Sequence, residues 1–153
     1  MNLEPIGMSA RKNIALVAHD NRKVEMLDWA SWNRQILAQH NLFGTGTTGT
    51  LLEAELGLPV TKFKSGPLGG DQQIGAAIAD GRIDFVVFLW DPLEAHSHDV
   101  DVKALLRIAA VYNIPIACTR SSADFMITSQ FMSEEYVRLV FAYDSSVAVS
   151  EEV

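Results

Sequence analysis

Apolar positions in this chain fall into short continuous runs separated by stretches with helical spacing. Consecutive apolar residues predict buried strands, whereas apolar positions three or four apart predict helices that bury one face. The predicted strands are NIALVA (13–18), HNLFG (40–44), VTKFK (60–64), IDFVVFLW (83–90) and IPIAC (114–118). The predicted helices are a long stretch up to about Gln39, then about 47–55, 70–80, 99–112 and 121–127.

Particular residues are expected to shape these helices. One side of the first helical stretch is apolar and is formed by Val24, Leu27, Ala30 and Trp32. Asp20 or Asn21 can cap the start of this helix, because short polar side chains accept hydrogen bonds from the first free N–H groups. Gly57 and Gly81 are expected to end the helices before them, since glycine is common directly after a helix.

Strands that alternate with helices are typical of a parallel sheet covered on both faces. We therefore expect a three-layer α/β/α fold, doubly wound around a five-stranded parallel sheet. The whole chain, 1–153, is expected to form a single domain with its core at about 11–128. The tail, 129–153, is harder to interpret, and YVRLVFAY (136–143) fits either a strand or a helix.

Polar residues follow four of the predicted strands at the point where each strand ends. Ligands of such folds bind outside the carboxyl ends of the strands, so these residues are expected to lie on one edge of the sheet. The four clusters are His19, Asp20 and Lys23; Thr45 to Gly49; Ser65 to Asp71; and Asp91 to Asp101.

The stretch GTGTTG (44–49) matches the glycine pattern of dinucleotide-binding sites. The acidic residue expected about 20 residues later is absent, because the third strand ends in Lys64 and Ser65. A site for NADP, with Lys64 on the extra phosphate, is one alternative, and a tight turn with a threonine cap is another. We prefer a phosphate monoester site in which Thr45, Thr47 and Thr48 surround the anion at a helix N-terminus. Lys23, in the first turn of its helix, would add a cation.

The loop SGPLGGDQQIG (65–75) contains a second group of backbone donors, at Ser65 and Gly66, followed by Asp71. A carboxylate cannot rest against a phosphate, because two like charges 4 Å apart repel by about 4 kcal/mol at an effective dielectric constant of about 20. Asp71 is therefore expected to act on a carbon atom further along the substrate, as a general base. The alternative is an acid that only stabilises the first turn of a helix.

The stretch DPLEAHSHDVDV (91–102) adds further titratable groups. His98 and Asp101 are three residues apart and share a face if the helix has begun. His96, His98 and Asp101 could instead bind a metal, although the sequence offers no obvious fourth ligand and we expect no metal. Arg107 is expected to pair with Asp101 or Asp71.

Composition excludes several classes of protein. The chain of 153 residues has a formal net charge of −7, which disfavours nucleic-acid binding because that requires a basic surface. No apolar run approaches the roughly 20 residues that span a bilayer, and the N-terminus has no signal-peptide pattern. The one cysteine, Cys118, is expected to be a buried strand thiol. We therefore expect a soluble cytoplasmic protein.

Six motifs together resemble the methylglyoxal synthase family. They are ALVAHD (15–20), TGTTG (45–49), SGPLGGDQQ (65–73), WDPL (90–93), HDVDVKALLR (98–107) and YNIPIA (112–117). The resemblance implies a homo-oligomer, commonly a hexamer, that converts dihydroxyacetone phosphate to methylglyoxal and inorganic phosphate in a bypass of glycolysis. It implies no metal and no organic cofactor.

The resemblance also assigns roles to residues. It implies that Asp71 is the general base, that His98 serves the enediol oxygens and that Asp101 supports this pair. The substrate and phosphate pocket would consist of His19, Lys23, Thr45, Gly46, Thr47, Thr48, Ser65 and Gly66. Asp20, Asp91 and Arg107 would support it.

The chain departs from the family at Val100, where proline is usual, and at Arg120, where asparagine is usual. It has no Lys or Arg after Arg138, although family members often bring a tail arginine to the phosphate site of a neighbouring subunit. One hypothesis is that Arg120 supplies this charge. An alternative function is a non-catalytic module that senses a phosphate or nucleotide, but such a module need not keep acids at 71 and 101 or a histidine at 98.

Overall fold

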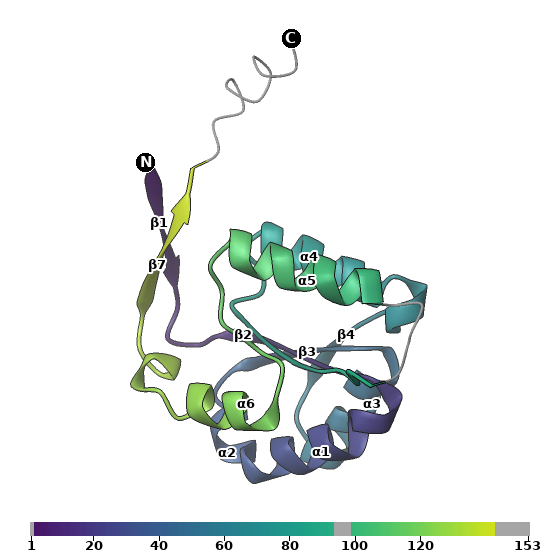
Figure 1. The fold of residues 1–153 in the computed structure, drawn as a ribbon. Coiled ribbons are helices and arrows are strands. Elements are labelled where there is room, and N and C mark those ends of the chain that lie inside the picture. The colour runs from purple at the N-terminus through teal and green to yellow at the C-terminus, as the bar shows by residue number, and fades with distance from the viewer. Residues whose placement is uncertain (1, 94–98, 143–153) are drawn as a thin grey trace.

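A five-stranded parallel sheet forms the centre of the computed structural model (Figure 1), which describes residues 2–93 and 99–142, the side chains of 99–101 excepted. In chain order its strands are β2 (Asn13–Ala18), β3 (Asn41–Thr45), β4 (Val60–Phe63), β5 (Phe85–Leu89) and β6 (Ile116–Ala117). Their order in space is β4-β3-β2-β5-β6. The chain builds outward from β2 to one edge and then returns to the other side of β2, which confirms the doubly wound topology.

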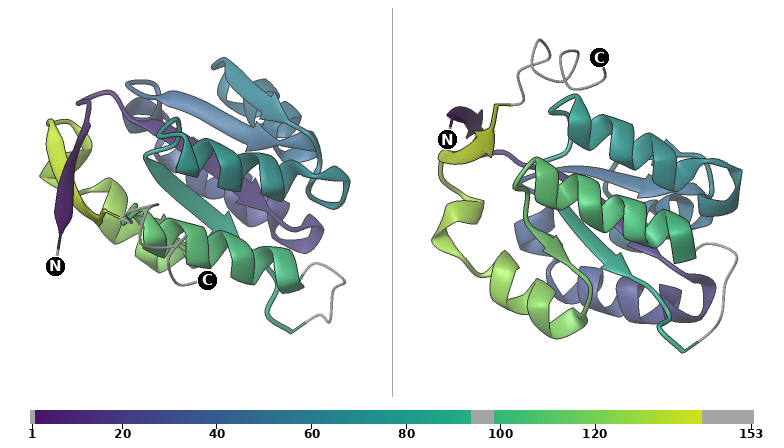
Figure 2. Two further views of the ribbon diagram at one scale, coloured as in Figure 1. Left: turned by 90° about the horizontal axis from the view of Figure 1, so that it is seen from above. Right: turned by 45° about the horizontal axis from the view of Figure 1, so that its top comes forward.

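Helices cover both faces of this sheet, as Figures 1 and 2 show. One face carries α4 (Gly70–Ala79) and α5 (Asp99–Val111). The other carries α1 (Lys23–Trp32), α2 (Arg34–Leu37), α3 (Gly46–Leu56) and α6 (Arg120–Ile127). Three short 3₁₀ turns are η1 (Asp20–Arg22), η2 (Gly66–Leu68) and η3 (Gln130–Met132).

The core lies in two layers because successive side chains of a strand point to opposite faces of the sheet. In β5, Phe85, Val87 and Leu89 join the layer under α1 and α3, whereas Val86 and Phe88 join the layer under α4 and α5. Both faces of the strand are therefore apolar, which is why its sequence is a continuous hydrophobic run. The three-layer architecture is confirmed.

The first helical stretch differs from the prediction in two ways. It is broken at Asn33 into α1 and α2, and the buried side chains of α1 are Met26, Trp29 and Ala30. Val24 and Trp32, which we expected on the apolar side, are 79% and 81% exposed. Trp29 fixes which face of α1 packs on the sheet. Its side chain is buried, and its Nε1 donates a hydrogen bond to Asp124 at 3.0 Å.

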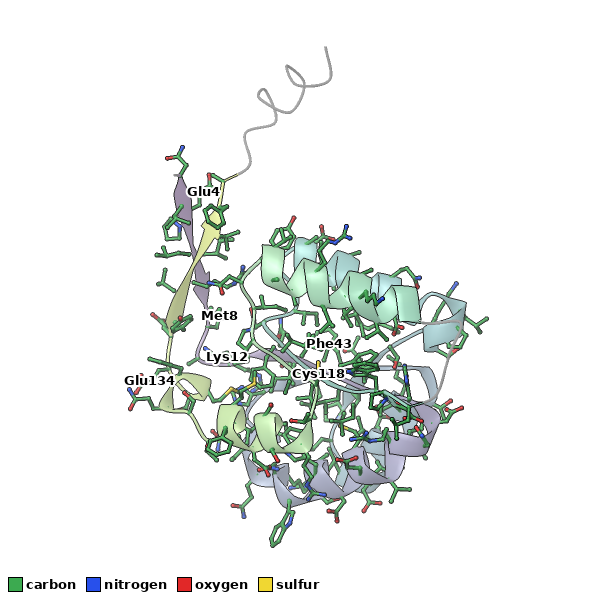
Figure 3. All side chains as sticks on the ribbon, in the orientation of Figure 1. Glu4, Met8, Lys12, Phe43, Cys118 and Glu134 are labelled. Carbon is green, nitrogen blue, oxygen red and sulfur yellow. The ribbon has the colours of Figure 1, made fainter. Side chains whose placement is uncertain are left out.

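A two-stranded antiparallel ribbon stands beside the sheet and joins the two ends of the described chain (Figure 1). It pairs β1 (Leu3–Met8) with β7 (Tyr136–Phe141), so the segment that fitted either a strand or a helix is a strand. Figure 3 places Met8, Lys12 and Glu134 where the ribbon meets the body. There the buried Lys12 ammonium donates to the carbonyl oxygens of Ser9 and Glu134.

The helix ends follow the sequence closely. Gly57 caps α3 with φ of 65°, and Gly81 follows α4 with φ of 76°, so both predicted stops are confirmed. The strand β6 is shorter than the predicted 114–118, and Cys118 lies just beyond it, half-buried rather than fully enclosed. Among the described helices, none is both long and apolar enough to cross a membrane.

Candidate functional site

A cavity of about 590 Å³ opens at the carboxyl ends of β2, β3 and β4. Loops that follow the first three strands of the sheet build its walls, as the sequence predicts for this fold. It brings together most of the predicted site residues, namely His19, Asp20, Lys23, Thr45, Thr47, Thr48, Ser65, Gly66 and Asp71. Residues as far apart in the sequence as His19 and Asp71 therefore share one cavity, because parallel strands end at one edge of the sheet.

His19 sits directly after β2 and is fixed from two sides. Its ring packs edge-on against Phe88, with ring centroids 5.4 Å apart and an interplanar angle of 79°. Its Nδ1 accepts a hydrogen bond from the backbone N–H of Asp91 at 3.2 Å. A nitrogen that accepts a hydrogen bond carries no proton, so the neutral ring bears its proton on Nε2. Asp91 thus supports His19 through its backbone.

The loop between β2 and α1 carries opposite charges. The Lys23 ammonium pairs with the Asp20 carboxylate, and both line the cavity. The Asn21 side chain donates to the Asp91 carboxylate, which ties the loop after β2 to the loop after β5. Our expectation that Asp20 or Asn21 caps the helix is wrong, because α1 begins at Lys23 and Arg22 precedes it without a capping side-chain bond. Both side chains bind groups other than the free N–H groups of the helix.

The threonine loop joins β3 to α3. Thr45 occupies the N-cap position of α3, but its side chain makes no capping hydrogen bond. This disfavours the interpretation of the motif as a threonine-capped turn. Thr48 is buried and its hydroxyl donates to the Ala18 carbonyl at 3.4 Å, whereas Thr47 is exposed to the cavity. The first backbone N–H groups of α3 stand at this wall, where the helix dipole favours an anion.

Gly46 places this loop against the neighbouring one. Its φ is +32°, and a Cβ added there would stand 2.7 Å from Cα of Ser65. No side chain fits in that space, since real Cβ atoms essentially never approach backbone so closely. The glycine therefore allows the threonine loop and the Ser65 loop to meet, although Gly46 itself is not part of the cavity wall.

The loop from Ser65 to Gly70 is closed by its own backbone. The Ser65 carbonyl accepts hydrogen bonds from the N–H groups of Leu68 and Gly70, both at 3.0 Å. The next residue, Asp71, lies in the first turn of α4 and is only 6% exposed. A carboxylate this buried at the edge of a cavity is uncommon unless it has a function or a partner.

Several predicted residues are not placed in this cavity. His96 and His98 lie outside the described residues, and the side chain of Asp101 is not described, so their roles stay predictions. Arg107 lies exposed on α5, and its pairing with Asp101 or Asp71 also stays a prediction. Within the described part of the chain, no group of three His, Cys, Asp or Glu side chains is arranged to bind a metal.

Arg120, which we considered as a source of charge for the phosphate, does not line the cavity. Its Nη1 lies 2.7 Å from Oδ2 of Asp28 in α1. This ion pair holds the guanidinium against its own chain.

The end of β2, at Val17 and Ala18, also lines the cavity. Two loop residues of the wall, Asn21 and Pro67, were not predicted as part of the site. Their position directly after predicted strands was the available signal, but neither residue type points to a particular chemistry.

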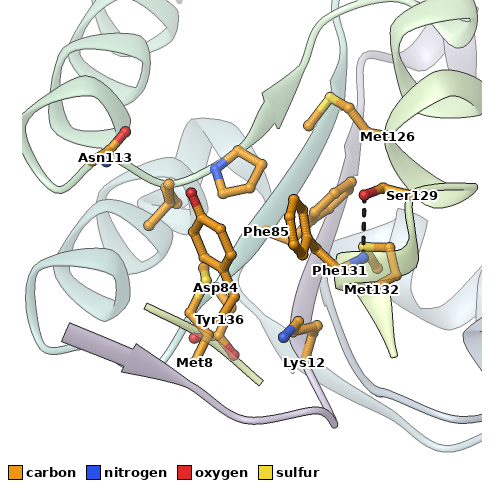
Figure 4. A pocket seen from close by; sticks show the side chains of 12 residues that line it. Met8, Lys12, Asp84, Phe85, Asn113, Met126, Ser129, Phe131, Met132 and Tyr136 are labelled. Carbon is orange, nitrogen blue, oxygen red and sulfur yellow. Dashed lines mark hydrogen bonds between the residues drawn. The ribbon is translucent and has the colours of Figure 1, made fainter. Parts of the chain in front are cut away.

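A second cavity, of about 300 Å³, lies at the base of the ribbon (Figure 4). Its wall is largely apolar and includes Met8, Phe85, Met132 and Tyr136, with Lys12 at one side. It contains none of the predicted site residues, and its Lys12 ammonium is already bound by carbonyl oxygens. The larger cavity is therefore the candidate active site.

Comparison with known proteins agrees with this fold and identifies a family. Residues 25–118 match the family described as MGS-like domain. The chain is 53% identical over 145 residues to methylglyoxal synthase of Leptospira interrogans, which covers 95% of this chain and 98% of that protein. It is 57% identical over 141 residues to methylglyoxal synthase of Saccharophagus degradans, which covers 92% of each.

A solved structure is similar throughout. The crystal structure of methylglyoxal synthase from Elizabethkingia anophelis NUHP1 matches with a TM-score of 0.88 and 47% sequence identity, over 94% of this chain and 95% of that one. The chain therefore belongs to the methylglyoxal synthase family and is an enzyme of that type.

Proposed function

We propose that the enzyme converts dihydroxyacetone phosphate to methylglyoxal and inorganic phosphate in the cavity at the end of β2, β3 and β4. The observation that carries the proposal is that Asp71 shares this cavity with Lys23, Thr47 and Ser65. Lys23, Thr47 and Ser65 offer groups that suit an anion, and the buried carboxylate of Asp71 lies beside them.

In this proposal the phosphate is bound by Lys23, the threonine loop, and the backbone at Ser65 and Gly66. Helix N-termini and a lysine stabilise a phosphate because both present positive charge to it. Asp71 then removes a proton from the hydroxymethyl carbon of the substrate, which gives an enediolate. His19 presents Nε2–H as a donor, and by resemblance His98 serves the enediol oxygens with support from Asp101.

Phosphate leaves in the next step. The electron pair of the enediolate forms a new carbon–carbon double bond as the carbon–oxygen bond to phosphate breaks. The resulting enol then tautomerises to methylglyoxal, gaining a proton on its methylene carbon and losing one from its hydroxyl oxygen. The bond must stand perpendicular to the enediolate plane for this overlap. The cavity groups that bind phosphate would therefore set orientation as well as affinity.

The direct test is incubation of the purified protein with dihydroxyacetone phosphate, with methylglyoxal and free phosphate measured together. Equal amounts of both products are expected. Phosphate without methylglyoxal would indicate a phosphatase, and neither product, with phosphate binding intact, would favour the sensing module. Turnover that a chelator abolishes and zinc restores would support the metal site at His96 and His98.

The same proposal includes a cytoplasmic location and a homo-oligomer, a hexamer by family resemblance. Light scattering after size-exclusion chromatography measures the mass of the assembly. A monomer at working concentration would contradict this part of the proposal without affecting the chemistry.

A further inference from the structure

Gln73 joins the two ends of the loop that carries Ser65 and Gly66, which we call the neck of the loop (Lys64 and the start of α4). Gln73 is not part of the cavity wall. Its side-chain Oε1 accepts a hydrogen bond from the backbone N–H of Lys64 at 2.8 Å. Lys64 follows β4 directly, and Gln73 lies in the first turns of α4. The bond therefore joins the end of a strand to the start of the next helix.

The position of β4 explains why this N–H is available to a side-chain acceptor. β4 is an edge strand that pairs only with β3, and the last pair of their register is Thr45 with Phe63. Lys64 lies one residue beyond this pair. Gln73 provides a protein acceptor for the Lys64 N–H, which would otherwise be open to water.

A second contact closes the same neck through the backbone alone. A Cβ added to Gly70 would stand 2.0 Å from the carbonyl oxygen of Lys64, so the two chain segments touch. The Gly70 N–H also donates to the Ser65 carbonyl at 3.0 Å. The phosphate-binding part of the loop and the start of the helix that carries Asp71 are thus tied together at two points.

We propose that Gln73 is a positioning residue that fixes Ser65 and Gly66 relative to the carboxylate of Asp71. This inference rests on the proposed function and adds a residue to it. The reaction requires the base to face a substrate carbon while the phosphate is bound by the same loop. A displacement on the order of 1 Å between such groups can lower the rate about 100-fold. Gln73 contacts neither the substrate nor Asp71 in this proposal and acts only through the Lys64 bond.

Four variants test the proposal. Gln73→Met keeps the length of the side chain and removes the acceptor, and Gln73→Asn keeps the amide but is one methylene too short to reach. Gln73→Glu keeps an acceptor oxygen at the same place. Gln35→Met, at an exposed glutamine in α2, is the matched control. For each we would measure kcat and KM for dihydroxyacetone phosphate, the Kd for inorganic phosphate and the Tm.

Gln73→Met and Gln73→Asn are expected to lower kcat between about tenfold and about 100-fold. The Kd for phosphate should change less than about threefold, because the groups that bind phosphate are all retained. Gln73→Glu and Gln35→Met should keep kcat within about threefold of the parent enzyme.

Two results would overturn the inference while the proposed function stands. One is an unchanged kcat in either folded variant that lacks the acceptor, with only a lower Tm, which would make Gln73 a stabilising residue and no more. The other is an equal loss of kcat in Gln73→Glu, which would show that the acceptor is not the feature that matters. A parent enzyme that produces no methylglyoxal would instead reject the proposed function, and this inference with it.

Discussion

The carboxylate of Asp71 lies against Gly66. A Cβ added to Gly66 would stand 3.5 Å from Oδ1 and 3.6 Å from Oδ2 of this carboxylate. Any side chain at position 66 would therefore contact the carboxylate and remove water from it. One short loop thus brings a buried acid and the backbone that the proposal assigns to the phosphate into the same cavity, which is the arrangement that the proposed chemistry needs.

Asp71→Asn is expected to abolish turnover and preserve anion binding. The amide keeps the size of the side chain but cannot accept a proton from carbon, and the loss of a general base lowers rates about 100-fold to about 10,000-fold. Inorganic phosphate should bind equally well or more tightly, because a like charge has been removed from the cavity. Steady-state kinetics and titration calorimetry measure the two effects separately.

Asp80→Asn serves as the control for this variant, since Asp80 is exposed at the opposite end of α4. It should leave both turnover and binding unchanged. An Asp71→Asn enzyme that turns over normally but no longer binds phosphate would reverse the two assignments.

Gly46→Ala is expected to damage both stability and phosphate binding. The added methyl group meets the backbone of Ser65 at 2.7 Å, and φ of +32° is itself strained for alanine. Together these effects should lower the free energy of unfolding by about 2–5 kcal/mol and separate the two loops that contact the anion.

Gly57→Ala is the matched comparison because φ there is +65° but nothing lies within 4 Å of the added atom. It should lower the free energy of unfolding by only about 1–2 kcal/mol and leave phosphate binding intact. Urea unfolding and calorimetry provide both quantities. Equal effects of the two substitutions would show that the contact with Ser65 is unimportant.

Much of the architecture could be predicted because the central strands β2 and β5 are buried on both faces and have continuous apolar sequences. The cavity loops could be predicted because parallel strands end at one edge, which gathers residues that are far apart in the sequence. The strand β1 was not predicted, because its sequence has no continuous apolar run. Its sequence, LEPIGM, contains Pro5 and Gly7, which are both rare in strands, and it is extended only because it pairs with β7 near the other end of the chain.

The partners of individual loop side chains also could not be predicted from the sequence. Asp20 and Asn21 have the residue types of helix caps, but Asp20 pairs with Lys23 and Asn21 bonds to Asp91, which comes from a distant loop. Gln73 gives no signal in the sequence, since its importance depends on an N–H group that only the edge position of β4 leaves available. Pairings between loops decide such contacts, and a local pattern does not contain them.

Stability is expected to fall between neutral and mildly acidic pH because of His40. This side chain is buried, and Nδ1 accepts a hydrogen bond from the backbone N–H of Lys12 at 2.9 Å. Burial lowers the pKa of His40 below its ordinary value of 6.5, and the charges of Lys12 and Arg11 lower the pKa further. The unfolded chain therefore binds a proton more readily than the folded one, so the His40 contribution is complete above about pH 6.5 and decreases as the pH falls toward the folded pKa.

His40→Asn tests this prediction, since the amide oxygen can accept the same hydrogen bond but does not titrate. Urea unfolding at about pH 7.5 and about pH 5 should show a smaller loss of stability in the variant than in the parent protein. Most carboxylates titrate below this range, near about pH 4. An identical pH dependence in the two proteins would show that other groups control acid stability.

Arg120→Ala is expected to leave the reaction almost unchanged, although Arg120 stands where asparagine is usual in the family. Its guanidinium is bound to Asp28 at 2.7 Å and lies outside the cavity wall. A partly exposed pair of this kind contributes on the order of 0.2–1 kcal/mol, so only a small decrease in Tm should follow. In Arg120→Ala, KM for the substrate and the inhibition constant for phosphate should change less than about twofold. In Lys23→Ala, both constants should rise between about tenfold and about 100-fold, because the substitution removes a charged hydrogen bond. A loss in Arg120→Ala comparable to that in Lys23→Ala would show that Arg120 leaves Asp28 in the working assembly and reaches the phosphate of a neighbouring subunit.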